Sequence, residues 1–171
     1  MQIDHSRQRA ICSLLSVAVG ILFFAAPIAV AGEALNKKEG DTISSFSRWV
    51  IAADYAADGS LLVTAGGESL LYRPGDVVVW KSDGSRVGEL SGHPTAVWAV
   101  DVSSDGKLAA TAGYDGLVKV WDLQSRKLKA DLKQHKGWVR SLAFSPDGAR
   151  LASAGEDGKV FLWNTKDGKA A

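Results

Sequence analysis

The chain has 171 residues, of which 46% are hydrophobic and 23% charged, and its formal net charge is +1. Such values are ordinary for a globular protein of one domain, and they exclude a wholly disordered or collagen-like chain. They also argue against a nucleic-acid partner, because the chain has no excess of cations to hold phosphates.

The first 31 residues have the pattern of a secretory signal peptide. Arg7 and Arg9 precede residues 11–31, a stretch of 21 residues that contains no charge and ends in Ala-Val-Ala. A basic start, an apolar middle and a small-residue exit are what signal peptidase accepts. We therefore predict cleavage after Ala31 and an exported protein, periplasmic or extracellular. The alternative is an uncleaved membrane anchor formed by residues 11–31, since about 20 apolar residues span a bilayer.

Residues 32–47 are polar and rich in small residues, which predicts a linker. Within it, the segment from Thr42 to Phe46 is a candidate strand. The only cysteine, Cys12, lies in the predicted signal. The remaining chain therefore has no thiol for a disulfide, a nucleophile or a zinc site.

Residues 48–171 contain a repeat of about 42 residues. Trp80, Trp121 and Trp163 lie 41 and 42 residues apart, and His93 and His135 lie 42 apart. A fixed period of this size indicates one supersecondary unit repeated along the chain. We predict three units, at about 48–90, 91–132 and 133–171.

Each unit has the pattern of short antiparallel strands. β-Branched and aromatic residues roughly alternate with others in two segments of the second unit and two of the third: Val97–Val102, Val118–Trp121, Leu142–Phe144 and Val160–Trp163. Seven Asp-Gly pairs separate the strands, and Asp-Gly supplies the positive φ angles of tight hairpin turns. Four such strands per unit, labelled a to d in chain order, are typical of a propeller blade.

These units resemble the WD repeats of β-propellers. The resemblance rests on Gly92-His93 through Trp121-Asp122, and on His135, Ser145-Pro146-Asp147-Gly148 and Trp163. It implies an all-β fold, a partial propeller of three four-stranded antiparallel blades. Only three residues follow Asp167-Gly168, so we expect the third blade to lack most of its outer strand. The implied function is a non-catalytic protein–protein interaction scaffold.

The resemblance also assigns a buried hydrogen-bonded tetrad to two of the blades. The eight residues are His93, Thr111, Asp115 and Trp121 in the second unit, and His135, Ser153, Asp157 and Trp163 in the third. Hydroxyl, imidazole and carboxylate could also be a catalytic triad or metal ligands. The set repeats, however, and the chain has no Gly-x-Ser-x-Gly elbow. We therefore predict no catalytic residue, no metal and no cofactor. The alternatives are an enzyme on a propeller scaffold and a non-functional fragment of a longer WD-repeat protein.

Partner-binding positions follow from the same resemblance, at the start of strand a and just before the b–c turn. The candidates are Trp138, Arg140 and Glu156 in the third unit, Ala96, Trp98 and Tyr114 in the second, and Trp49 and Ile51 in the first. We expect Trp138 and Arg140 to be exposed; the competing interpretation is packing between blades.

The first unit departs from the pattern. Phe46 takes the histidine position, and the b–c connection at residues 68–76 is six residues longer. The longer connection is either a simple surface loop or a binding loop led by Tyr72 and Arg73.

Three units are fewer than the four or so blades of a closed ring. We therefore expect self-association, because uncovered sheet faces and edges favour it. The simplest form is two chains in one six-bladed ring, each N-terminal strand completing the other chain's third blade.

Overall fold

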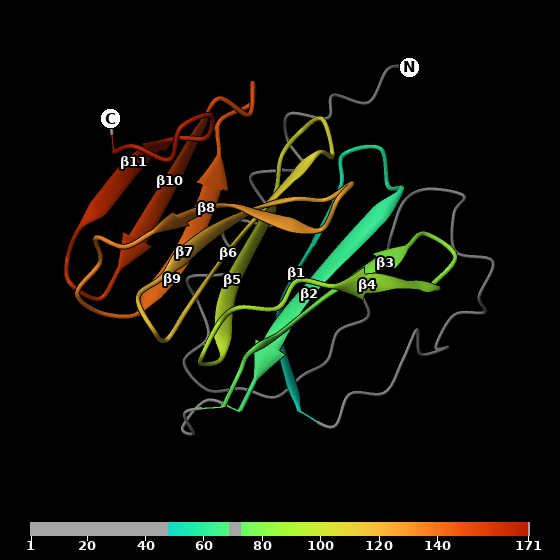
Figure 1. The fold of residues 1–171 in the computed structure, drawn as a ribbon, viewed down its shortest axis with the longest axis horizontal. Coiled ribbons are helices and arrows are strands. Elements are labelled where there is room, and N and C mark those ends of the chain that lie inside the picture. Colours follow the sequence, from blue (N-terminus) through green and yellow to red (C-terminus); the bar gives the residue numbers. More distant parts are fainter. Residues whose placement is uncertain (1–47, 69–72, 171) are drawn as a thin grey trace, which may run out of the picture. The chain divides into compact units, whose positions relative to one another are not determined.

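The computed structural model describes residues 48–68 and 73–170, and the regular secondary structure of these residues is entirely β-strand. The strands form three antiparallel sheets that follow one another along the chain (Figure 1). Sheet 1 consists of β1 (Trp49–Tyr55), β2 (Leu61–Gly67), β3 (Asp76–Lys81) and β4 (Arg86–Glu89). Sheet 2 consists of β5 (Val97–Val102), β6 (Leu108–Gly113), β7 (Val118–Asp122) and β8 (Lys127–Leu132). Sheet 3 consists of β9 (Val139–Phe144), β10 (Arg150–Gly155) and β11 (Val160–Asn164).

The predicted class and architecture, all-β with three blades of a partial propeller, are confirmed. The four strand segments predicted from the sequence fall in β5, β7, β9 and β11. β9 begins three residues earlier than predicted, at Val139. Sheet 3 has three strands, and one antiparallel bridge between Trp163 and Ala170 starts a fourth.

All seven Asp-Gly pairs lie at turns. Their glycines have φ between 67° and 81°, the left-handed region in which a side chain would be strained. In each pair the aspartate carboxylate accepts a hydrogen bond from the backbone N–H two residues later, as Asp58 does from Ser60 at 2.9 Å. The turns are therefore specified locally by the Asp-Gly dipeptide.

Two apolar clusters join the sheets. We call the face of each sheet that carries its buried tryptophan (Trp80, Trp121 or Trp163) the front face, and the opposite face the rear face. The rear face of sheet 1 packs against the front face of sheet 2 in a cluster that includes Val63, Val77, Val79, Val97 and Trp121. The rear face of sheet 2 packs in the same way against sheet 3, in a cluster that includes Val118, Val120, Leu151 and Trp163. Each sheet thus buries its apolar face only by packing on a neighbour.

Several sequence predictions lie outside the described residues. They are the signal segment at 1–31, the linker at 32–47 with its candidate strand and Phe46, and Tyr72. Within residues 48–68 and 73–170, no helix is long and apolar enough to cross a membrane.

Candidate protein-interaction face

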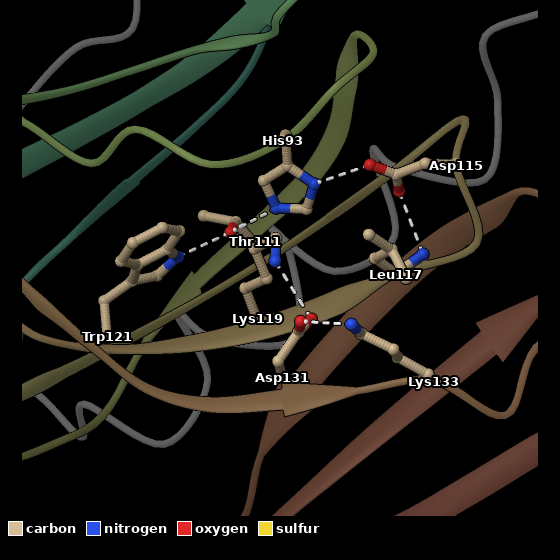
Figure 2. A network of polar contacts seen from close by, with 8 residues as sticks. All are labelled: His93, Thr111, Asp115, Leu117, Lys119, Trp121, Asp131 and Lys133. Atoms are coloured by element: carbon tan, nitrogen blue, oxygen red, sulfur yellow. Dashed lines mark hydrogen bonds and ion pairs between the residues drawn. The ribbon is translucent and has the colours of Figure 1, made fainter.

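A buried polar network runs through sheet 2 (Figure 2). His93 Nδ1 lies 3.0 Å from the Asp115 carboxylate, and His93 Nε2 lies 2.8 Å from Thr111 Oγ1. The indole N–H of Trp121 donates to the same hydroxyl oxygen at 2.7 Å. A proton on Nδ1 then satisfies every polar atom, because Nε2 accepts from the hydroxyl while the hydroxyl accepts from the indole. The structure thus brings together the four residues that the resemblance assigned to this blade.

Sheet 3 repeats the network. His135 Nδ1 lies 3.0 Å from Asp157, His135 Nε2 lies 2.9 Å from Ser153 Oγ, and Trp163 Nε1 donates to Ser153 Oγ at 2.8 Å. Gly155, at the end of β10, leaves room for this arrangement, since a Cβ there would lie 2.6 Å from His135 Nδ1.

Sheet 1 keeps part of the network. Trp80 Nε1 donates to Thr64 Oγ1 at 2.9 Å.

The hydroxyls of the two full networks are not placed for catalysis. Thr111 and Ser153 are both 0% exposed, and each already accepts a hydrogen bond from an indole. A buried hydroxyl in this position cannot reach a substrate carbonyl, so the networks hold the strands of each blade together.

The carboxylate of the sheet 3 network is strongly favoured in its charged form. The backbone N–H of Lys136 donates to Asp157 at 3.0 Å. This hydrogen bond, aided by those from His135 and the Lys159 backbone, lowers the pKa of Asp157 from 3.8 to about 2.

An ion pair lies beside the sheet 2 network. The Lys119 ammonium, 5% exposed, lies 2.9 Å from the Asp131 carboxylate, and Lys133 lies 2.7 Å from its other oxygen (Figure 2). Partial burial acts to raise the pKa of Asp131, but the hydrogen bonds from Lys133 and Lys119 outweigh it and lower that pKa.

Five predicted binding residues meet in one cluster, which we call the rim cluster: Trp98, Tyr114, Trp138, Arg140 and Glu156. The Trp98 and Trp138 rings stack with centroids 6.4 Å apart, and Tyr114 lies 4.1 Å from Trp138. The Arg140 guanidinium lies 4.5 Å from the Trp98 ring centroid and 4.8 Å from that of Trp138. Its Nε donates to Glu156 Oε1 at 2.9 Å.

The rim cluster joins sheets 2 and 3. Trp98 lies on β5 and Tyr114 follows β6, whereas Trp138 precedes β9, Arg140 lies on it, and Glu156 follows β10. The side chains of Arg140 and Glu156 are 39% and 43% exposed, and the three aromatic residues are half-buried. The indole N–H of Trp98 is buried without an acceptor in the described part of the chain. The cluster therefore has an exposed charged pair over a half-buried aromatic base.

Other candidate residues lie apart from this cluster. Ala96 is only 1% exposed, so it is wrong as a partner contact; its small side chain packs in the core while its carbonyl accepts from the Tyr114 N–H. Trp49 is 62% exposed on β1, and Ile51 is half-buried. Arg73, 61% exposed, pairs with Glu68 at 3.2 Å. Among the described residues, no group of three or more His, Cys, Asp or Glu side chains could hold a metal ion.

Sequence reasoning missed two carboxylates that link neighbouring sheets. Asp54 on β1 accepts from the backbone N–H of Val102 at 2.7 Å, and Asp101 on β5 accepts from that of Phe144 at 2.5 Å. Asp54 and Asp101 are 47 residues apart, the same separation as the Asp-Gly turns at 58 and 105. That match is the signal that could have found them.

The comparisons with known proteins agree with this architecture. The family described as "WD domain, G-beta repeat" matches residues 84–122 and 126–164. The eukaryotic translation initiation factor 3 subunit I of Phaeosphaeria nodorum is 30% identical over 86 residues, which are 50% of this chain and 24% of that protein. Its counterpart in Scheffersomyces stipitis is 33% identical over 73 residues, 43% of this chain and 19% of that protein.

A solved structure has the same fold. The crystal structure of RRP9 WD40 repeats superimposes with a TM-score of 0.68 at 21% identity, covering 75% of this chain and 39% of that one. This chain thus spans about a quarter or less of the length of the curated relatives named above. Residues 84–122 and 126–164 are thus WD repeats, and the three described sheets have the fold of part of a WD-repeat propeller.

Proposed function

We propose that this protein is a non-catalytic interaction scaffold that binds another protein through the rim cluster. WD-repeat proteins are typically interaction scaffolds, and the rim cluster is the observation that carries the proposal for this chain. Tryptophan, tyrosine and arginine are the residue types that dominate protein-interface energetics. Here they lie together, half-buried, with an arginine ordered across two indoles.

The arrangement is already organised for binding. Arg140 is held by Glu156 and by the faces of Trp98 and Trp138, so little side-chain entropy remains to be lost when a partner docks.

Binding can be tested with one matched pair of variants. Arg140→Ala removes the guanidinium over the indoles, and we expect it to weaken capture of the partner about tenfold or more. Arg86→Ala is the control, because Arg86 also forms an exposed pair with a glutamate, Glu89 at 2.8 Å. The measurement is quantitative mass spectrometry of proteins retained by each immobilised variant. Equal retention by both variants would overturn the proposal.

We also propose that the protein is exported. The support is the basic, apolar and small-residue pattern of residues 1–31. Intact mass measurement of protein recovered outside the cytoplasm should give a chain that starts at Gly32. An uncleaved chain recovered with the membrane would favour the anchor, and one in the cytoplasm would refute export.

We propose, finally, that the chain self-associates. Large apolar side chains are exposed on the outermost described sheets: Trp49 at 62% and Val50 at 45% on β1, and Val160 at 67% and Leu162 at 45% on β11. Exposed large apolar side chains of this kind favour association.

A further inference from the structure

The rear faces of the three sheets have the same pattern of residues at equivalent positions. Cross-strand partners share a face, so the pairing defines one row across each sheet. The row contains Asp54, Val63, Val79 and Gly88 in sheet 1, and Asp101, Ala110, Val120 and Ala130 in sheet 2. In sheet 3 it contains Ala143, Ala152 and Leu162.

The row is covered in two sheets and open in the third. Val79 and Val120 are 0% and 1% exposed because the next sheet packs on them, whereas Leu162 is 45% exposed. Val118 and Val160 form a second such pair, 0% and 67% exposed. The rear face of sheet 3 therefore has the composition of a packing surface, and it is uncovered in the described chain.

One position in the row differs in sheet 3. Asp54 and Asp101 each accept a hydrogen bond from a backbone N–H on the first strand of the following sheet, β5 and β9 respectively. The equivalent residue of sheet 3 is Ala143, which is exposed. A surface built to receive a further sheet in the same head-to-tail manner would need that carboxylate, because the N–H of the arriving strand would otherwise be buried without an acceptor.

The front face of sheet 1 also offers little exposed apolar surface to the rear face of sheet 3 of another copy. Leu62, Val78 and Trp80, which form the apolar cluster on that face, are only 5–7% exposed. A head-to-tail contact between the rear face of one copy and this front face of another would therefore bury little further surface of these three side chains.

We propose that two copies of this chain pair through the rear faces of their third sheets, rear face to rear face, about a two-fold axis. This inference rests on the proposed self-association and specifies its surface. A two-fold contact brings the same patch of both copies together, so each apolar residue on it is buried twice. Alanine at position 143 suits this geometry, because an aspartate there would be buried in each copy without the backbone N–H that Asp54 and Asp101 accept. Arg150, at the margin of the face where β10 begins, stays at the edge of the contact.

Sedimentation velocity on protein purified from cells that express the full sequence tests the pairing. We expect a dimer for the unchanged chain. Leu162→Asp and Ala143→Asp should raise the dimer dissociation constant by about tenfold or more, since each buries an unpaired carboxylate. Leu128→Asp is the matched control, because Leu128 is 43% exposed on β8 of sheet 2 and should leave the dimer intact.

Ala143→Asp distinguishes the two geometries. It gives sheet 3 the residue type that Asp54 and Asp101 provide at the equivalent positions of sheets 1 and 2. The variant is therefore compatible with the fold and would strengthen a head-to-tail contact. Tighter association of this variant, a monomeric unchanged chain, or equal weakening by Leu128→Asp would each overturn the rear-face dimer. Capture of the rim-cluster partner is measured on the same variants. An unchanged chain that is monomeric but captures the partner would overturn the dimer and leave the scaffold proposal standing. An unchanged chain that is dimeric, with equal capture by Arg140→Ala and Arg86→Ala, would overturn the scaffold proposal and leave the dimer standing.

Discussion

At the scale of single residues, the hydroxyl at the centre of each tetrad bridges the imidazole and the indole. Thr111 receives the Trp121 indole and binds the His93 imidazole, all of them buried. Among the described residues, Thr64 in sheet 1 accepts from the Trp80 indole at a comparable distance, and its hydroxyl donates at 3.5 Å to the Val78 carbonyl rather than to an imidazole. The same residue type therefore has different energetic weight in the two sheets.

Replacing this hydroxyl by a methyl group should measure that difference. Thr111→Val keeps the volume but leaves a buried indole N–H and an imidazole nitrogen without partners. We expect a loss of about 2–4 kcal/mol in the free energy of unfolding, measured by urea titration. Thr64→Val should lose about half as much. Equal losses would show that the histidine bond contributes nothing.

The lowered pKa of Asp157 predicts that the protein loses stability in acid over a defined pH range. Its pKa falls from 3.8 to about 2 on folding, chiefly through the Lys136 backbone N–H. A carboxylate whose pKa is depressed on folding stabilises the protein fully above pH 4, and this contribution is lost as the pH falls from about 4 to 2. The urea midpoint should therefore decrease over this range less steeply in Asp157→Asn than in the unchanged chain. Parallel curves would contradict the assignment.

At the scale of elements, the repeat as the family describes it is offset from the sheet. Each matched segment, 84–122 and 126–164, runs from the outer strand of one sheet through the first three strands of the next. The chain thus connects neighbouring sheets covalently within each repeat. The carboxylates of Asp54 and Asp101 add a hydrogen bond across the same joints.

Removing one of these carboxylates should weaken the interface between one pair of neighbouring sheets. Asp101→Ala removes the acceptor of the Phe144 N–H, which lies at the interface of sheets 2 and 3. We expect a loss of about 1–3 kcal/mol in unfolding free energy. Asp101→Asn is the control, because its amide oxygen still accepts, and it should lose less. Indistinguishable variants would mean that the joint does not depend on this bond.

At the scale of the whole molecule, each sheet packs only on its sequence neighbours, as in other repeat proteins. In the described residues, sheet 1 packs on sheet 2 and sheet 2 packs on sheet 3, whereas the rear face of sheet 3 is exposed. Stability then depends on what covers that face.

A dimer through the rear faces should make the melting temperature depend on protein concentration. By mass action, a tenfold increase in concentration should raise the midpoint by about 2 °C. Ala143→Asp should show the same dependence only at concentrations about tenfold higher or more. A concentration-independent midpoint for the unchanged chain, measured by differential scanning calorimetry, would contradict the dimer.

Much of the architecture could be read from the sequence. Strands, turns and the number of blades followed from the alternation of β-branched residues and from seven Asp-Gly pairs, because these signals act over two to six residues. The tetrad residues followed from their period and resemblance to the family. The inter-sheet role of Asp54 and Asp101 did not, because an aspartate in a strand carries no local mark of a partner on another sheet.

The sequence by itself determined that this is a repeated all-β chain, since its periodic turns admit few other folds. Only the tertiary structure decided that Arg140 crosses the rings of Trp98 and Trp138. It also showed that Val160 is exposed where its equivalents Val77 and Val118 are buried. The physical reason is the same in both cases. The exposure and contacts of a residue depend on whether another sheet packs on its face. Similar repeats have similar residues at equivalent positions, so the sequence of one repeat does not show which of its faces is covered.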